Sequence, residues 1–340
     1  MTPKITDAFR FLSKLSIQKI WNGAKVWFSF YVSKYSKRNF HSGFPISLAI
    51  EPTTSCNLRC PECPSGLRSF TRPTGMLPTQ LFKKIIDELY KNLTSLTFYF
   101  QGEPYLHPNF TELVNYAHKK NIYTSTSTNA HFLDDKNCQK TIESGLDRLI
   151  ISIDGTSQET YQAYRIGGKL EKVIEGTRNM LAWRAKLKSK TPYIIFQFLV
   201  VKPNEHQISE VQDLATKLGV DEVKFKTAQI YDYKNGSPLM PSIEKYARYR
   251  KNAEGVYEIK NSLENSCWRM WQSCVMTWDG SIVPCCFDKD AHHKLGNLEN
   301  NSFAEIWQSL DYQEFRQKLL RSRSEIEMCK NCTEGTKVWA

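Results

Sequence analysis

The stretch "EPTTSCNLRCPECPSG" at residues 51–66 places Cys56, Cys60 and Cys63 in the spacing C-x3-C-x2-C. No fourth cysteine lies close to these three in the sequence. A structural zinc site is closed by four ligands, whereas a catalytic metal centre keeps one position open for substrate or solvent. Three thiolates in one loop can hold three irons of an iron-sulfur cube and leave the fourth iron free. The loop therefore predicts a metal centre with an open position.

The composition around this loop is that of a globular protein. The 340 residues are 41% hydrophobic, which allows one large core and a smaller appendage. No apolar run is long enough to span a membrane, and the N-terminus lacks the features of a secretory signal, so we expect a cytoplasmic protein. Because cytosolic thiols stay reduced, the seven of the ten cysteines that fall into two groups indicate metal ligands rather than disulfides.

Six β-rich runs between residues 45 and 235 alternate with amphipathic helical stretches. The predicted strands are residues 46–51, 95–100, 122–127, 148–153, 193–201 and 222–227. Single helices are predicted at about residues 79–92, 109–120, 134–144 and 206–218, and more than one helix within residues 157–188. Parallel neighbours need helical crossovers, so this alternation predicts a parallel sheet. The expected fold class is α/β, a partial (β/α)6 TIM-like barrel with a small C-terminal cysteine-rich domain.

Polar motifs follow the first four predicted strands. The cysteine loop follows the first, "QGEP" (101–104) the second and "TN" (128–129) the third, while "SIDG" (152–155) ends the fourth. Each motif alone is most simply a turn. In barrels of this kind, however, chemistry collects at the carboxyl ends of the strands. The shared placement of the motifs therefore predicts a single site.

The second group of cysteines lies beyond a polar stretch. Residues 236–265 are predicted to form a linker and one helix, and residues 266–340 a second domain. The sequence "SCVMTWDGSIVPC" predicts a β-hairpin that turns at Asp279-Gly280 and returns Cys285 towards Cys267. A plausible four-thiolate set is Cys267, Cys285, Cys329 and Cys332, in which Cys286 could replace Cys285. Tetrahedral sulfur suits both zinc and iron-sulfur, so the residues alone leave both open.

Residues 1–44 form a basic amphipathic segment outside these two groups. They hold eight Lys or Arg and a single acidic residue, and so account for most of the net charge of +11. The rest of the chain is only mildly basic, and we expect no nucleic-acid partner. Apolar residues recur at helical spacing: Ile17, Ile20, Trp21, Ala24, Trp27, Phe28, Tyr31 and Tyr35. This helix either packs against the main domain or makes peripheral contact with an anionic membrane.

The two cysteine groups together resemble the radical S-adenosylmethionine (SAM) enzymes that carry a C-terminal SPASM or twitch-type domain, over roughly residues 45–340. The resemblance implies a 4Fe-4S cluster on Cys56, Cys60 and Cys63, whose free iron binds S-adenosyl-L-methionine. It also implies one auxiliary 4Fe-4S cluster on the second group, because further cysteines that two auxiliary clusters would need are missing.

The same resemblance assigns residues that bind the cofactor. Gly102 and Glu103 match a motif that receives the methionyl ammonium, and a carboxylate suits this role because it accepts charge-assisted hydrogen bonds. Asn129 and Ser152 match contacts to the ribose or the methionyl end, and Arg165 matches an arginine that pairs with the methionyl carboxylate. The chain departs from the family at Gln101, where glycine is common, and at Glu62, where an aromatic residue is frequent.

A radical enzyme is thus the leading hypothesis. The resemblance implies reductive cleavage of SAM to a 5′-deoxyadenosyl radical and hydrogen abstraction from an unidentified small-molecule or peptide substrate. The auxiliary cluster would help to oxidise or modify that substrate, as in a small-molecule dehydrogenase or a peptide maturase. A low-potential donor such as flavodoxin or ferredoxin would supply electrons, and no catalytic acid or base is assigned. The contrasting hypothesis is a non-enzymatic, zinc-stabilised protein whose basic arm binds a membrane or an acidic partner.

Overall fold

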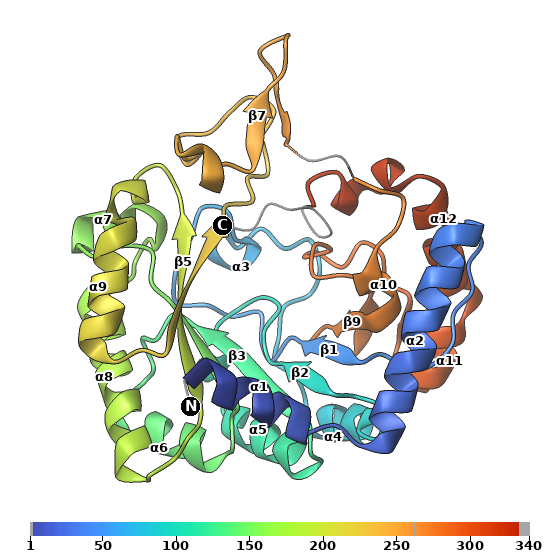
Figure 1. Cartoon of the computed structure of the whole chain (residues 1–340), viewed down its shortest axis with the longest axis horizontal. Coiled ribbons are helices and arrows are strands. Elements are labelled where there is room, and N and C mark those ends of the chain that lie inside the picture. The colour runs from blue at the N-terminus through green and yellow to red at the C-terminus, as the bar shows by residue number, and fades with distance from the viewer. Residues whose placement is uncertain (1–2, 261–262, 333–340) are drawn as a thin grey trace.

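The computed structural model describes residues 3–260 and 263–332 and confirms the predicted α/β fold (Figure 1). Six parallel strands lie side by side in chain order: β1 (Ser47–Ile50), β2 (Ser95–Thr97), β3 (Tyr123–Thr128), β4 (Arg148–Ser152), β5 (Tyr193–Val200) and β6 (Glu222–Thr227). The helices between them are α4 (Thr79–Leu89), α5 (Phe110–Lys119), α6 (Asp135–Glu143), α7 (Gln158–Tyr164), α8 (Leu170–Lys186) and α9 (Ile208–Leu218). Figure 1 shows these helices around the outside of the curved sheet.

The crossover helices pack against the sheet through one apolar face each. In α4 the buried residues are Phe82, Ile85, Ile86 and Leu89, which recur at the spacing that places them on one side of a helix. The ring of Phe82 lies 5.7 Å from that of Phe98, just after β2. Burying one such side chain contributes about 1.5–3 kcal/mol, so these faces fix the helices on the sheet.

The sheet continues beyond β1 into the C-terminal part of the chain. Strand β9 (Ser273–Met276) pairs parallel with β1, and β10 (Ser281–Val283) pairs antiparallel with β9. A short strand, β11 (Gly296–Asn297), ends the sheet at this edge. The predicted hairpin is therefore confirmed, with Gly280 at a φ of 79° in its turn. Backbone hydrogen bonds of one nine-stranded sheet join the second cysteine-rich region to the barrel.

The prediction of a helix within residues 236–265 is wrong. The described part of this stretch holds an antiparallel pair, β7 (Tyr249–Lys251) and β8 (Tyr257–Ile259), and a single 3₁₀ turn, η3 (Glu244–Tyr246). A tight turn explains the difference, because Asn252 Oδ1 accepts hydrogen bonds from the backbone N–H groups of Glu254 and Val256. Figure 1 shows this hairpin projecting away from the barrel.

Helices from both ends of the chain cover the edge of the sheet near β9. They are α2 (Ile17–Ser36), α10 (Trp268–Gln272), α11 (Phe303–Gln308) and α12 (Leu310–Arg321). Trp271 and Trp307 are fully buried between them, and the Arg316 guanidinium lies 4.5 Å from the centre of the Trp307 ring. The shorter elements are α3 (Pro64–Leu67), η1 (Pro104–Leu106), η2 (Glu205–Gln207), η4 (Arg323–Glu325) and η5 (Glu327–Cys329).

The N-terminal segment forms two helices, and its basic residues partly face inward. Helix α1 (Pro3–Ser13) lies at the amino ends of the strands, where Asp7 accepts a hydrogen bond from the Tyr123 hydroxyl. In α2 the prediction of a helix is confirmed, but its apolar face points into solvent, with Trp21 64% and Phe28 59% exposed. No helix in the described part of the chain has the length and apolar content needed to cross a bilayer.

Candidate functional site

The cysteine loop follows β1 and lines a cavity of about 230 Å³. All eight residues predicted for the first cluster and for SAM line this one cavity: Cys56, Cys60, Cys63, Gly102, Glu103, Asn129, Ser152 and Arg165. Seven of them come from the carboxyl ends of four neighbouring parallel strands, which meet at one edge of the sheet, and Arg165 directly follows α7. The juxtaposition predicted from the sequence is therefore present.

Of the three cysteines in this loop, Cys60 is buried and Cys56 and Cys63 are half-buried. Burial raises the pKa of Cys56 to about 11, although a backbone hydrogen bond from Leu58 to its sulfur opposes the shift. Burial also raises the pKa of Cys60. Thiols of this kind stay protonated at neutral pH until a metal centre displaces the proton. The set thus fits a cluster that binds and deprotonates its own ligands.

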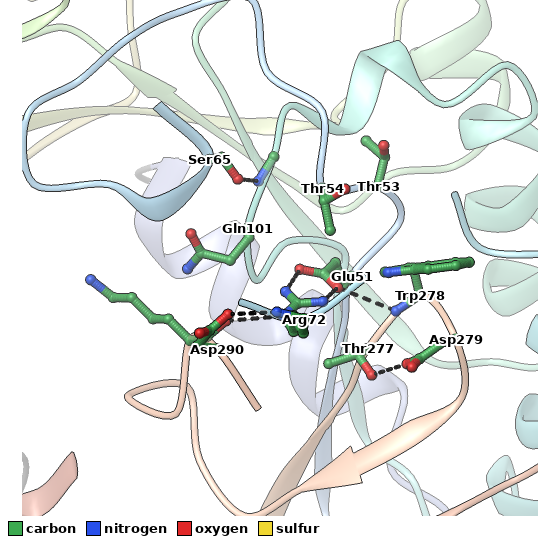
Figure 2. A network of polar contacts seen from close by, with 12 residues as sticks. Glu51, Thr53, Thr54, Ser65, Arg72, Gln101, Thr277, Trp278, Asp279 and Asp290 are labelled. Carbon is green, nitrogen blue, oxygen red and sulfur yellow. Dashed lines mark hydrogen bonds and ion pairs between the residues drawn. The ribbon is translucent and has the colours of Figure 1, made fainter. Parts of the chain in front are cut away.

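Gly102 lets two loops approach each other closely. Its φ is 75°, and a Cβ built at this position would lie 2.1 Å from the carbonyl oxygen of Thr53. The Gly102 N–H donates to Ser65 Oγ at 2.9 Å, which ties the loop after β2 to α3 (Figure 2). A side chain here would push apart the two loops that line the cavity.

Glu103 is a buried carboxylate with ordered donors. It accepts hydrogen bonds from Thr128 Oγ1 at 2.7 Å and from the Asn129 N–H at 2.8 Å. Burial nevertheless raises its pKa to about 7, because these donors only partly offset the cost of desolvating the charge. A cation entering the cavity would stabilise the ionised form, as an ammonium group does.

Arg165 is held in place by a residue that the sequence prediction did not assign. Its Nε donates to Asp154 Oδ2 at 2.5 Å, and its Nη1 lies 3.8 Å from Cys60 Sγ. Asp154 is fully buried and also accepts from the Leu199 N–H at 2.7 Å. The signal for Asp154 was available, because it belongs to the "SIDG" motif that ends β4.

The two departures from the family pattern both make contacts next to the cysteines. Gln101 Oε1 lies 3.8 Å from Cys63 Sγ, within reach of a thiol hydrogen bond. Glu62 accepts a hydrogen bond from the Tyr231 backbone N–H at 2.9 Å and so links the cysteine loop to the segment that follows β6. Gln101 and Glu62 therefore fit this fold, and neither departure from the family pattern removes a predicted ligand.

Three cysteines of the second group, Cys267, Cys329 and Cys332, lie near the buried Arg323. Arg323 Nη2 lies 3.3 Å from Cys332 Sγ, and its charge also acts on Cys267 and Cys329. Cys285 lies close enough to Cys267 for their charges to interact. No three Cys, His, Asp or Glu side chains within residues 3–260 and 263–332 converge tightly enough for a single metal ion. A cluster, by contrast, distributes its thiolates over several irons.

A larger cavity of about 480 Å³ adjoins the first one and shares Tyr99 and Phe100 with its lining. It extends to Cys285 and Cys286, so it lies between the two cysteine groups. Four cationic side chains line it, and none of the described residues in its lining is Asp or Glu. These cations are Lys226, Arg248, Arg269 and Lys289. The charged side chains of the described lining are therefore all basic, while the Glu62 carboxylate outside this lining acts on the Lys289 ammonium.

A polar network that the sequence did not reveal joins the cysteine loop to the C-terminal hairpin (Figure 2). Arg72 makes two hydrogen bonds to Glu51, at 2.5 and 2.8 Å, at the end of β1. Glu51 also accepts from the Trp278 N–H at 3.3 Å, next to the turn of the hairpin. The Thr71 N–H donates to Asp290 at 3.0 Å. The loop that bears the first cysteines is thus anchored on the second region.

Two family models match the chain. The model of the radical SAM superfamily matches residues 50–197, and the SPASM model of an iron-sulfur cluster-binding domain matches residues 267–333. A curated relative from Pyrococcus furiosus, the tungsten-containing aldehyde ferredoxin oxidoreductase cofactor-modifying protein, is 27% identical over 301 residues. This alignment covers 79% of the chain and 82% of the relative.

Solved structures with the same fold include three SAM-bound proteins. SuiB from Streptococcus suis bound to S-adenosylmethionine has a TM-score of 0.63 at 16% identity, and the match covers 90% of this chain and 75% of SuiB. The protein anSMEcpe with bound AdoMet has a TM-score of 0.61 at 18% identity, and the match covers 86% of this chain and 88% of anSMEcpe. BtrN in complex with AdoMet and 2-DOIA has a TM-score of 0.53 at 18% identity, and the match covers 87% of this chain and 95% of BtrN.

Proposed function

Because the chain belongs to the radical SAM superfamily and carries an iron-sulfur SPASM domain, we propose that it takes hydrogen from a substrate held in the larger cavity. Its cofactors are a 4Fe-4S cluster, SAM and auxiliary iron-sulfur clusters. When bound, the reduced cluster supplies one electron that cleaves SAM to a 5′-deoxyadenosyl radical. The observation that carries the proposal is the single cavity lined by all eight predicted residues, which shares a wall with the larger cavity.

The residues of the smaller cavity have complementary roles in this proposal. Cys56, Cys60 and Cys63 hold the first cluster. Glu103 receives the methionyl ammonium, since it is a buried carboxylate whose ionised form a cation would stabilise. Arg165 pairs with the methionyl carboxylate while Asp154 fixes its orientation. Gly102, Asn129 and Ser152 contribute backbone and polar groups to the remaining wall.

The second group is proposed to hold one auxiliary 4Fe-4S cluster. Its proposed ligands are Cys267, Cys329, Cys332 and one of the two neighbours Cys285 and Cys286. Cys285 and Cys286 both line the larger cavity. A cluster held by four thiolates has no free iron, which favours electron transfer from the substrate over direct coordination. Buried Arg323 offsets the negative charge of the thiolates. A low-potential protein such as flavodoxin or ferredoxin is the proposed reductant of the enzyme.

The substrate is proposed to carry an anionic group. Lys226, on β6, and Lys289 both line the larger cavity, and the described residues of this lining include no Asp or Glu. Half-buried cations that line a cavity stabilise a ligand of opposite charge. The substrate is either a small molecule or part of a peptide, and the enzyme acts as an oxidoreductase or a maturase.

Anaerobic reconstitution tests the cofactors and the reaction. Two cubane clusters predict about eight irons per chain, whereas the zinc-stabilised alternative predicts zinc without iron. With dithionite and SAM, the protein is expected to release 5′-deoxyadenosine. A chain that holds both clusters but releases none would contradict the enzymatic proposal.

A deuterium transfer assay tests the substrate class. Extracts of cells grown in deuterated medium are separated on an anion exchanger and incubated with the reconstituted enzyme, and 5′-deoxyadenosine is analysed for deuterium. Transfer is expected from the retained, anionic fractions. Transfer from the unretained fraction alone would contradict the anionic substrate but leave SAM cleavage supported.

A further inference from the structure

Helix α2 presents an apolar surface that the proposed chemistry does not use. We call it the aromatic face, and it consists of Ile17, Ile20, Trp21, Ala24, Trp27, Phe28, Tyr31 and Tyr35. At about 100° per residue these eight side chains fall within an arc of roughly 120°. Ile17 is 88% exposed, Trp27 56% and Tyr35 77%. An apolar stripe this wide normally faces the core of a protein.

The opposite face of α2 already holds the helix on the protein. Its buried residues are Lys19, Asn22, Val26, Ser29, Phe30 and Ser33. Asn22 exchanges two hydrogen bonds with the backbone of Phe44, at 2.8 and 2.9 Å, and Lys19 Nζ donates to the Asn121 carbonyl at 2.6 Å. Turning the aromatic face inward would break these bonds. The aromatic face therefore stays on the surface, where a binding partner can reach it.

The aromatic face is continuous along the helix. The rings of Trp27 and Tyr31 lie 4.7 Å apart, and those of Tyr31 and Tyr35 lie 6.2 Å apart. From Ile17 to Tyr35 the helix rises about 27 Å at 1.5 Å per residue. Figure 1 places α2 along the outer edge of the molecule. Soluble monomers rarely expose apolar surface of this extent unless it has a binding role.

Most of the charges beside the aromatic face are positive, and the Glu264 carboxylate near the end of α2 forms an ion pair with Lys34 at 3.0 Å. Lys25, Lys37 and Arg38 are exposed, and none of the three forms an ion pair with another described residue. The Lys25 ammonium lies 5.8 Å from the centre of the Trp21 ring, at the border of the face. Asp7, the acidic residue of this segment, lies on α1 and bonds to Tyr123 and Arg148. A complementary partner must therefore be both apolar and anionic.

We propose that the aromatic face docks α2 on the surface of an anionic lipid bilayer. The helix would lie parallel to the membrane, with its Trp and Tyr rings at the depth of the headgroups, where these residues are favoured. Lys25, Lys37 and Arg38 would contact lipid phosphates. A second copy of the chain fits less well, since a symmetric contact would bring the same cations together. This inference goes beyond the proposed reaction.

Vesicle flotation of the anaerobically purified, cluster-loaded full chain tests the inference. Binding is expected to vesicles that contain phosphatidylglycerol, to weaken as salt is added, and to be much lower on phosphatidylcholine alone. The triple variant Trp21→Gln, Trp27→Gln, Phe28→Gln should bind on the order of 10-fold more weakly or worse, because it removes most of the apolar contact. The variant Lys25→Glu, Lys37→Glu, Arg38→Glu should lose the preference for phosphatidylglycerol.

A matched control changes three exposed apolar residues elsewhere, Leu187→Gln, Ile243→Gln and Val256→Gln, and should bind like the parent. Circular dichroism and 5′-deoxyadenosine release verify that each variant is folded. Absence of binding by the intact chain, or unchanged binding by the aromatic variant, overturns the proposal. It is also overturned if the parent is a dimer in solution that the aromatic variant converts to a monomer, since the face would then join two copies.

Discussion

Arg72 and Glu51 form a buried, two-bond ion pair that ties the cysteine loop to the carboxyl end of β1, the strand that pairs with β9. The side chains are 5% and 0% exposed, so water screens the pair very little. Trp278, from the C-terminal hairpin, donates its N–H to the same carboxylate. The pair therefore couples the position of the first cysteines to that of the second region.

Arg72→Met should destabilise the protein by about 3–5 kcal/mol, because it leaves the Glu51 carboxylate buried without its partner. The measurement is the free energy of unfolding in urea, under anaerobic conditions. Lys172→Met, which removes an exposed ion pair with Glu175, serves as the control and should show no measurable change. Equal stabilities of the two variants would mean that the buried pair does not anchor the loop.

Gly102→Ala should disrupt the smaller cavity, because a Cβ would lie 2.1 Å from the Thr53 carbonyl oxygen. We expect at least a 10-fold loss in SAM affinity or a chain that does not fold, measured by equilibrium dialysis and circular dichroism. Gly219→Ala is the matched control, since Gly219 also has a positive φ, of 84°, but a Cβ there meets nothing within 4 Å. It should cost only about 1 kcal/mol of backbone strain. Equal SAM affinity in both variants would contradict the role of close packing at Gly102.

SAM affinity should rise with pH through the pKa of Glu103, which burial raises to about 7. Below that pH the free carboxyl carries a proton and must lose it before it can accept the ammonium. Each pH unit below the pKa therefore weakens binding by about 10-fold, and the dependence levels off above it until the methionyl ammonium loses its own proton at about pH 8. Glu103→Gln should bind SAM more weakly and with a flatter pH profile. A parent profile that is flat between about pH 6 and pH 8 would show that Glu103 is already ionised in the free enzyme.

Alanine variants of the two cysteine groups should differ in their effect on 5′-deoxyadenosine release. Replacing Cys56, Cys60 and Cys63 with alanine should abolish 5′-deoxyadenosine release and remove about four irons per chain. Replacing Cys329 and Cys332 should remove a similar amount of iron but spare release in the absence of substrate, because the first cluster stays intact. Iron analysis and chromatography of the nucleoside check both results. A reversed pattern would mean that the two groups have exchanged roles.

Much of the fold followed from local patterns in the sequence. The period of two in the strands, the apolar stripes of helices such as α4, and the turns between them mark parallel β–α units, whose carboxyl ends meet at one edge. The cysteine loop, Glu103 and Arg165 could therefore be assigned to one cavity. The region around residues 249–259 was missed because a hairpin this short depends on the turn at Asn252, which a polar stretch does not reveal.

The sequence by itself determined the six parallel strands, the cysteine spacing and the two-sided character of α2. Only the tertiary structure decided which side of α2 is buried, because periodicity distinguishes two faces but does not say what each will contact. It also decided that β9 extends the barrel sheet and that Arg72 meets Glu51. These are contacts between residues distant in the chain, and their geometry depends on how the elements between them pack.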